Sequence, residues 1–143
     1  MLNQQPETVE DWLKLADNYR AACELLISNP DMGAIAWSQA GFALECTMKA
    51  AIHAQFRFNR WPAQSERREL YTHDLEKLAG ILGMTVEPSA EIAPAWATVI
   101  QWRRTHMYNP SEFPPAVVRS LIDAVFSEEG MCQWMRRTYL PNY

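Results

Sequence analysis

Two arginines and a histidine that lie close together, Arg103, Arg104 and His106, form the sharpest chemical cluster in the sequence. Cleavage of RNA without a metal ion needs a base that takes the 2′-hydroxyl proton and a cation that stabilises charge on the phosphate. A histidine and an arginine can supply these two functions. On a helix that runs to the break at Asn109-Pro110, Arg103 and His106 would share one face. The alternative interpretation is a solvated helix end, where cations complement the helix dipole.

A second candidate cluster combines His73 with residues of the central apolar stretch. His73 stands at the expected start of a helix, where it is a candidate catalytic or phosphate-facing group. The alternative is structural, with His73 packed or hydrogen-bonded against a neighbouring helix. Glu45 and Lys49 are four residues apart in the order that favours pairing, and His53, four residues later, extends this polar patch. Such a pair is a candidate binding site or a device that specifies packing.

Arginines also concentrate at the end of the central stretch and in the linker that follows it: Arg57, Arg60, Arg67 and Arg68. Together with Phe58 and Trp61 they are candidates for stacking on RNA bases and contacting phosphates, with Arg67 and Arg68 as the candidate binding residues. Glu66 and Glu69 interleave with the arginines and dilute the positive field. The alternative interpretation is therefore a solvated linker.

The element that must position these groups is the stretch from residue 31 to residue 58, which reads as one long helix with Asp31 as a cap. It is apolar on more than one face, which is typical of a helix in the middle of a bundle. Apolar residues recur at helical spacing in four further segments: about 8–27, 72–83, 94–108 and 114–139. Thr72 is the expected cap of the second of these segments, and Gly130 is a point where the last can break. The sequence predicts an all-α, up-and-down bundle of four to five helices in a single domain over residues 1–143, with its core at about 8–139.

Composition narrows the classes of function. The 143 residues carry a net charge of −4, which argues against nonspecific nucleic-acid binding driven by total charge. The three cysteines lack zinc-ligand spacing and read as reduced thiols, so we expect no metal, no cofactor and a cytoplasmic location. No secretory signal is visible, and no apolar run approaches the roughly 20 residues of a membrane span, so we expect no membrane association.

Two blocks carry a resemblance to a known family: AGFALECTMKAAI at residues 40–52 and YTHDLEKLAGIL at residues 71–82. With the following helix that ends in an aromatic residue and Asn-Pro, they resemble the HEPN-domain proteins over about residues 10–137. The resemblance implies a helical bundle that forms homodimers and is linked to RNA or nucleotides. It also implies a place in toxin–antitoxin, defence or stress systems, in some members together with a minimal nucleotidyltransferase.

Catalytic members of this family resemble one another in a metal-independent RNase motif: Arg, four to six residues, His, and often a Tyr two places on. His106-Met107-Tyr108 is similar to the end of that motif, so the resemblance implies a role for Tyr108. The spacing places Gln101, Ile100 or Val99 where the motif has Arg. We therefore expect a non-catalytic HEPN-like module that binds a protein partner, RNA or a nucleotide. The alternatives are a divergent metal-independent RNase that uses an Arg/His pair, and a structural dimerisation partner of a nucleotidyltransferase.

Overall fold

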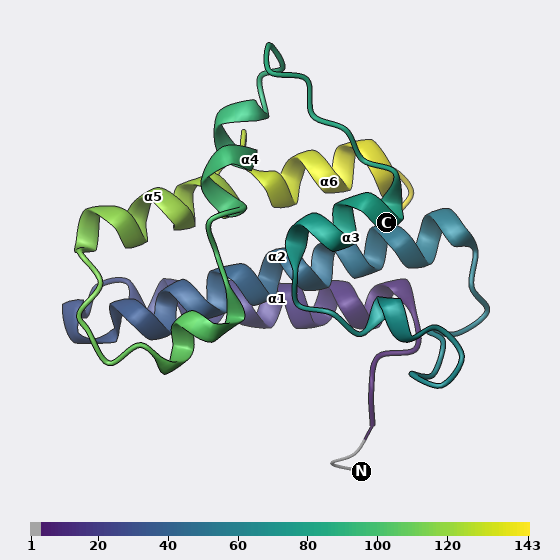
Figure 1. Ribbon diagram of the computed structural model, residues 1–143, viewed down its shortest axis with the longest axis horizontal. Helices are drawn as coiled ribbons and strands as arrows, with labels where there is room; N and C mark the ends of the chain where they lie inside the picture. Colours follow the sequence, from purple (N-terminus) through teal and green to yellow (C-terminus); the bar gives the residue numbers. More distant parts are fainter. Residues whose placement is uncertain (1–3) are drawn as a thin grey trace.

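Six α-helices and three short 3-10 helices form residues 4–143, the part of the chain that this computed structural model describes (Figure 1). The α-helices are α1 (Val9–Leu26), α2 (Gly33–Phe56), α3 (Leu75–Leu82), α4 (Ala93–Val99), α5 (Pro115–Phe126) and α6 (Met131–Tyr139). The 3-10 helices are η1 (Pro30–Met32), η2 (Arg68–Leu70) and η3 (Arg104–Tyr108). No strand occurs within this range, so the predicted all-α class is confirmed.

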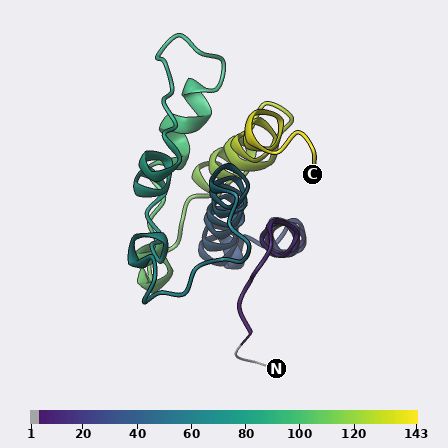
Figure 2. The same cartoon turned by 90° about the vertical axis from the view of Figure 1, so that its right-hand side faces the viewer.

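Helices α1 and α2 form the antiparallel hairpin that the short break between them predicts (Figures 1 and 2). The start of α1 is held by a capping box. The backbone N–H of Asp11 donates to Thr8 Oγ1 at 3.1 Å, and the Asp11 carboxylate accepts from the Thr8 N–H at 3.2 Å. At the other end of the hairpin, the Cys23 thiol donates to the carbonyl oxygen of Ala36 at 3.3 Å. This bond ties the last part of α1 to the first turns of α2.

Helix α2 is the centre of the bundle, as its apolar faces predict. In the end-on view of Figure 2, α1 lies on one side of it, α5 and α6 on another, and the segment with α3 and α4 on a third. Every residue from Ala43 to His53 is buried, including the charged Glu45 and Lys49. A helix buried all round cannot satisfy charged side chains with water, so their partners must come from the helix itself or from the neighbouring elements.

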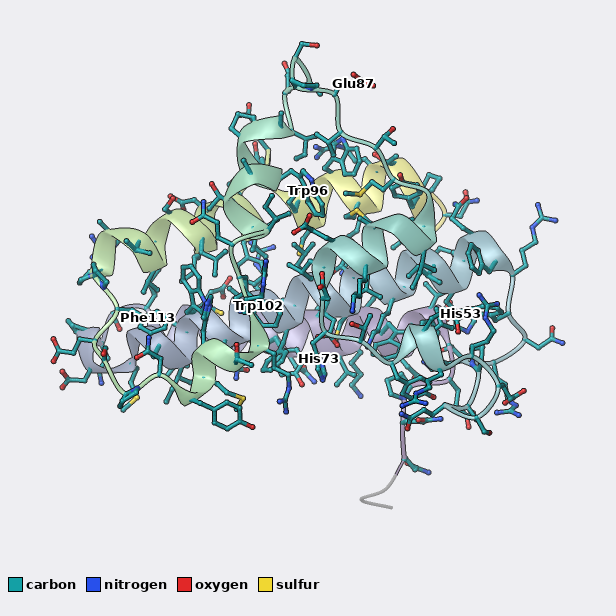
Figure 3. The ribbon with its side chains drawn as sticks, in the orientation of Figure 1. His53, His73, Glu87, Trp96, Trp102 and Phe113 are labelled. Atoms are coloured by element: carbon teal, nitrogen blue, oxygen red, sulfur yellow. The ribbon has the colours of Figure 1, made fainter. Side chains whose placement is uncertain are left out.

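A close approach between α2 and the segment after α4 positions the predicted catalytic cluster. Gly41 leaves room for the indole of Trp102, since a Cβ there would lie 1.8 Å from Cε2 of Trp102. The Trp102 indole N–H donates to the carbonyl oxygen of Trp37 at 3.1 Å, and its side chain is buried against α2 (Figure 3). The buried Trp102 side chain thus fixes the chain between the end of α4 and the turn of residues 103–108.

The structure corrects the expected helix over residues 94–108. Helix α4 ends at Val99, and Arg103 has an extended backbone with φ −134° and ψ 140°. The helical face that was to bring Arg103 and His106 together therefore does not exist. The expected helix over residues 114–139 is interrupted between Phe126 and Met131 and so forms α5 and α6, with an extended backbone at the possible break point Gly130 (φ −85°, ψ 173°).

Two expected helix caps are also wrong. Asp31 lies in η1, whose start is capped by Asn29: its side-chain oxygen accepts the Asp31 N–H at 3.1 Å. Helix α2 starts after Met32 with no side-chain cap. Helix α3 is capped by Asp74, which accepts the N–H groups of residues 76 and 77, while Thr72, two residues earlier, accepts the Asp74 N–H.

Within residues 4–143, no helix has both the length and the apolar character that crossing a bilayer requires.

Candidate functional site

The imidazole of His106 is held by two hydrogen bonds to the same nitrogen. The indole N–H of Trp37 donates to His106 Nδ1 at 3.0 Å, and the backbone N–H of Arg103 donates to the same atom at 3.2 Å. Because both partners are donors, Nδ1 carries a lone pair and the ring hydrogen is on Nε2. Burial and the nearby Arg103 charge both lower the pKa of His106. The ring is therefore neutral and fixed against α2.

This bonding removes the chemistry that a general base needs. The one basic nitrogen of the neutral ring already accepts two hydrogens, and the other nitrogen is a donor. To take a proton from a substrate, His106 would have to lose the Trp37 bond and its packing against Trp37 and Phe113, whose ring centroids lie 5.6 and 6.3 Å from its own. The geometry makes His106 an acceptor that fixes the turn after Trp102.

The two arginines beside His106 differ in their contacts. Arg103 Nη1 donates to the carbonyl oxygens of Ile100 and Trp102, the second at 2.9 Å, and its Nη2 lies 3.9 Å from Glu76 Oε1. The Nε atom of Arg104 is buried and has no hydrogen-bond partner among residues 4–143. Residues 103, 104 and 106 thus lie close together, as their spacing predicts, but the Arg103 guanidinium is bonded to carbonyl oxygens that follow the end of α4.

A buried ionic cluster links α2 to the segment before α3. Glu45 Oε2 accepts from Lys49 Nζ at 3.0 Å, which confirms the pair expected from their spacing. The other carboxylate oxygen, Oε1, lies 2.8 Å from Nδ1 of His73. Glu45 and Lys49 are each 6% exposed, whereas the His73 side chain is 48% exposed. His73 thus forms the hydrogen bond to a neighbouring helix that the structural interpretation expects.

The tautomer of His73 follows from its partner. A carboxylate oxygen only accepts, so the hydrogen that His73 shares with Glu45 sits on Nδ1. Nε2 of His73 has no hydrogen-bond partner among the residues that the structure describes, and this ring is half exposed. A carboxylate thus orients the His73 ring, as it does in a histidine that acts as a general base, whereas no carboxylate orients His106. Glu45 and His73 are separated by 28 residues, and no local sequence signal joins them.

Aromatic rings cover the rest of this cluster. The Lys49 ammonium lies 5.3 Å from the ring centroid of Trp12, a cation–π distance. Phe42 packs edge-on to His73, and Tyr19 packs on Phe42 with ring centroids 5.6 Å apart. Burial raises the pKa of the Tyr19 hydroxyl. The cluster is thus closed from α1 and open to solvent mainly at His73.

His53 does not join this cluster, contrary to expectation. Its Nε2 lies 2.8 Å from the carbonyl oxygen of Glu7, and its ring stacks on Trp61 at 6.1 Å. Figure 3 shows His53 near the C-terminal end of α2, well separated from His73. The N–H of Trp61 donates to the same Glu7 carbonyl at 2.9 Å, so His53 holds the segment before α1 in place.

The basic linker is partly neutralised, and one of its aromatic residues is inaccessible. Trp61 is 2% exposed, so it cannot stack on a base. The Arg67 guanidinium lies 5.6 Å from the ring centroids of both Phe56 and Phe58 and also pairs with Glu69. Arg60 pairs with Glu66 in the same way, while Arg68 lies on η2 and is exposed. These contacts favour the solvated-linker interpretation.

Metal-ligating and thiol groups offer no further site in the described residues. Residues 4–143 contain no group of three His, Cys, Asp or Glu side chains placed to hold a metal ion. All three cysteines are buried as free thiols: Cys23, Cys46 and Cys132. Burial raises the pKa of Cys23 and of Cys46 to about 12 and that of Cys132 to about 11. These thiols therefore stay protonated at neutral pH.

Exposed apolar side chains gather at one end of the bundle, which we call the apolar end. The end of α1 and the starts of α2 and α5 come together there, at the left of Figure 1, while η3 packs on α2 on the side away from α1 (Figure 2). Of the eight large hydrophobic side chains exposed in the described residues, six lie on these segments: Leu25, Ile27, Ile35, Met107, Tyr108 and Val117. Leu25 is 81% and Tyr108 71% exposed. Nothing in the sequence pattern predicts this gathering, because the six residues belong to four separate segments.

Compared with protein-family models, curated proteins and solved structures, this chain has no match. The HEPN resemblance of residues 40–52 and 71–82 therefore stays a prediction.

Proposed function

We propose that this chain is a non-catalytic, HEPN-like interaction module whose apolar end binds a protein surface, in the first place that of a second copy of the chain. The observation that supports the proposal is the gathering of six of the eight exposed large hydrophobic side chains at that end. Soluble monomers rarely expose contiguous apolar patches larger than a few hundred Å² unless the patch binds something. The toxin–antitoxin, defence or stress setting comes from the resemblance alone.

The composition of the apolar end fits a protein interface. Aromatic residues and Met are enriched at such interfaces, and Tyr108 and Met107 stand side by side on η3. A specific interface buries roughly 800 Å² on each partner, with a few anchor side chains at its centre. Leu25 and Tyr108 are the most exposed of the six residues and are therefore the expected anchors.

The bonding of His106 supports the non-catalytic part of the proposal over the RNase alternative. Its Nδ1 accepts from Trp37 and from the Arg103 backbone, and Arg103 donates to main-chain carbonyls. Neither His106 Nδ1 nor Arg103 Nη1 can act on RNA without breaking the contacts that hold the turn. We therefore expect no cleavage of mixed cellular RNA in EDTA. Cleavage by the wild type that is lost in His106→Ala would contradict this part of the proposal.

Sedimentation velocity tests the interface. We expect the wild type to sediment as a dimer at about 10 µM, an affinity ordinary for such patches, and the double variant Leu25→Glu/Tyr108→Glu to sediment as a monomer. The matched control is Phe56→Glu, because Phe56 is an exposed apolar residue 39% accessible at the far end of α2. A monomeric wild type, or a dimer that the double variant leaves intact, would count against the proposal.

A further inference from the structure

A small polar cleft lies between α1 and α6, above the middle of α2, on the side away from His73. It has a volume of about 220 Å³, and its lining includes Asp17, Arg20, Thr47, Cys132, Gln133 and Arg136. The end-on view in Figure 2 shows α1 and α6 on either side of α2, which forms the floor. The apolar end and the His73 cluster contribute no residue to this cleft.

Two arginines on the rim of the cleft have unused hydrogen-bond donors. Arg20 pairs through Nε with Glu24 at 3.2 Å, and Arg136 pairs through Nη2 with Asp17 at 3.0 Å. A guanidinium has five N–H donors, so both ends of Arg20 and two nitrogens of Arg136 have no partner among residues 4–143. The two existing ion pairs are partly exposed, and such pairs contribute little.

The floor of the cleft lies within reach of both positive charges. Thr47 Oγ1 donates to the carbonyl oxygen of Ala43 at 2.9 Å and lies 3.6 Å from the Cys132 sulfur. Burial raises the pKa of Cys132, while the charges of Arg136 and Arg20 act in the opposite direction. The guanidinium of Arg20 is also held 5.4 Å from the Phe126 ring centroid. The cleft is thus lined by two arginines, by the Asp17 carboxylate that pairs with Arg136, and by a neutral thiol and hydroxyl, so the arginines outnumber the carboxylate by one.

We propose that this cleft binds a small phosphate-bearing molecule through Arg20 and Arg136. A planar guanidinium fork matches phosphate oxygens, and a tetrahedral phosphate has enough acceptor oxygens to bind two forks at once. The volume of about 220 Å³ is below the ~300–1,000 Å³ of sites for drug-sized ligands. Inorganic phosphate or a phosphate ester of a few carbon atoms fits this space better than a nucleotide.

Calorimetric titration of the full chain with inorganic phosphate, at constant ionic strength maintained with chloride, tests this site. We expect saturable binding of one phosphate per chain, and about tenfold weaker binding in Arg20→Gln and in Arg136→Gln, since each removes charge-assisted hydrogen bonds. The matched control is Arg137→Gln. Arg137 is the next residue on α6, carries the same charge and donates to the Glu128 carbonyl oxygen outside the cleft.

Lysine variants separate the fork geometry from the charge and from any loss of folding. Arg20→Lys and Arg136→Lys keep the positive charge, and we expect them to bind phosphate more weakly than the wild type with unchanged circular dichroism. Absence of saturable binding up to about 20 mM phosphate, well beyond ordinary site affinities, would overturn the proposal. Equal weakening in Arg137→Gln would do the same, because it would show that only the net charge matters.

Discussion

Replacement of Gly41 by Ala is expected to destabilise the protein, although Ala is the better helix former. The new Cβ would lie 1.8 Å from Cε2 and 2.1 Å from Nε1 of Trp102, far inside van der Waals contact. Trp102 is 2% exposed and its indole N–H is bonded to the Trp37 carbonyl oxygen. The ring must therefore move away from α2, and the segment that it anchors must move with it.

The magnitude follows from three contributions. Overpacking of a core costs about 1–3 kcal/mol, and the buried hydrogen bond of Trp102 contributes about 0.5–1.5 kcal/mol. Ala in place of Gly inside a helix returns about 1 kcal/mol. The expected net loss in free energy of unfolding is about 2 kcal/mol, or a shift of the urea midpoint by about 1 M if the denaturant slope is near 2 kcal/mol/M.

Urea unfolding followed by far-ultraviolet circular dichroism measures this loss, and Gly80→Ala is the matched control. Gly80 lies in α3, and a Cβ there would meet no atom within 4 Å. The same substitution should therefore stabilise the protein by about 0.5–1 kcal/mol. If the two variants changed stability in the same direction, the close approach of Trp102 to Gly41 would be refuted.

Three further predictions follow from buried groups. The pKa of His106 is lowered in the folded protein, so the stability that the neutral ring contributes is present above its ordinary pKa of 6.5 and is lost as pH falls through the folded pKa. Thermal unfolding at pH values between 8 and 5 should show this loss of stability, and the loss should be smaller in His106→Gln. Glu45→Ala leaves the Lys49 ammonium buried without its carboxylate and should cost about 3–5 kcal/mol in urea unfolding, whereas Glu45→Ala/Lys49→Met should recover part of that loss; a double variant as unstable as the single one would contradict the pairing. In the native protein at pH 8, iodoacetamide should leave the three buried cysteines, Cys23, Cys46 and Cys132, largely unmodified. Mass spectrometry should show that they are labelled once urea unfolds the chain. Rapid labelling of the native protein would be inconsistent with their burial.

Local pattern alone determined the helical class and the central helix. Apolar residues at helical spacing predicted α1, α2 and α3, and the short break at Pro30 predicted the hairpin, because both signals act within a few residues of the chain. The pairing of Glu45 with Lys49 was predictable for the same reason, since residues four apart on a helix are neighbours.

Contacts between distant segments decided the candidate sites. The sequence pattern around Arg103 predicts a helix, but Trp102 packs on Gly41, 61 positions earlier in the chain, and the backbone at Arg103 is extended. The same packing brings Trp37 to His106 and turns the expected base into an acceptor. His73 meets Glu45, and Arg20 and Arg136 line the same cleft, only when the helices pack. Periodicity specifies which face of a helix is buried, whereas the partner of that face depends on the packing of the whole chain, and the chemistry of each site depends on that partner.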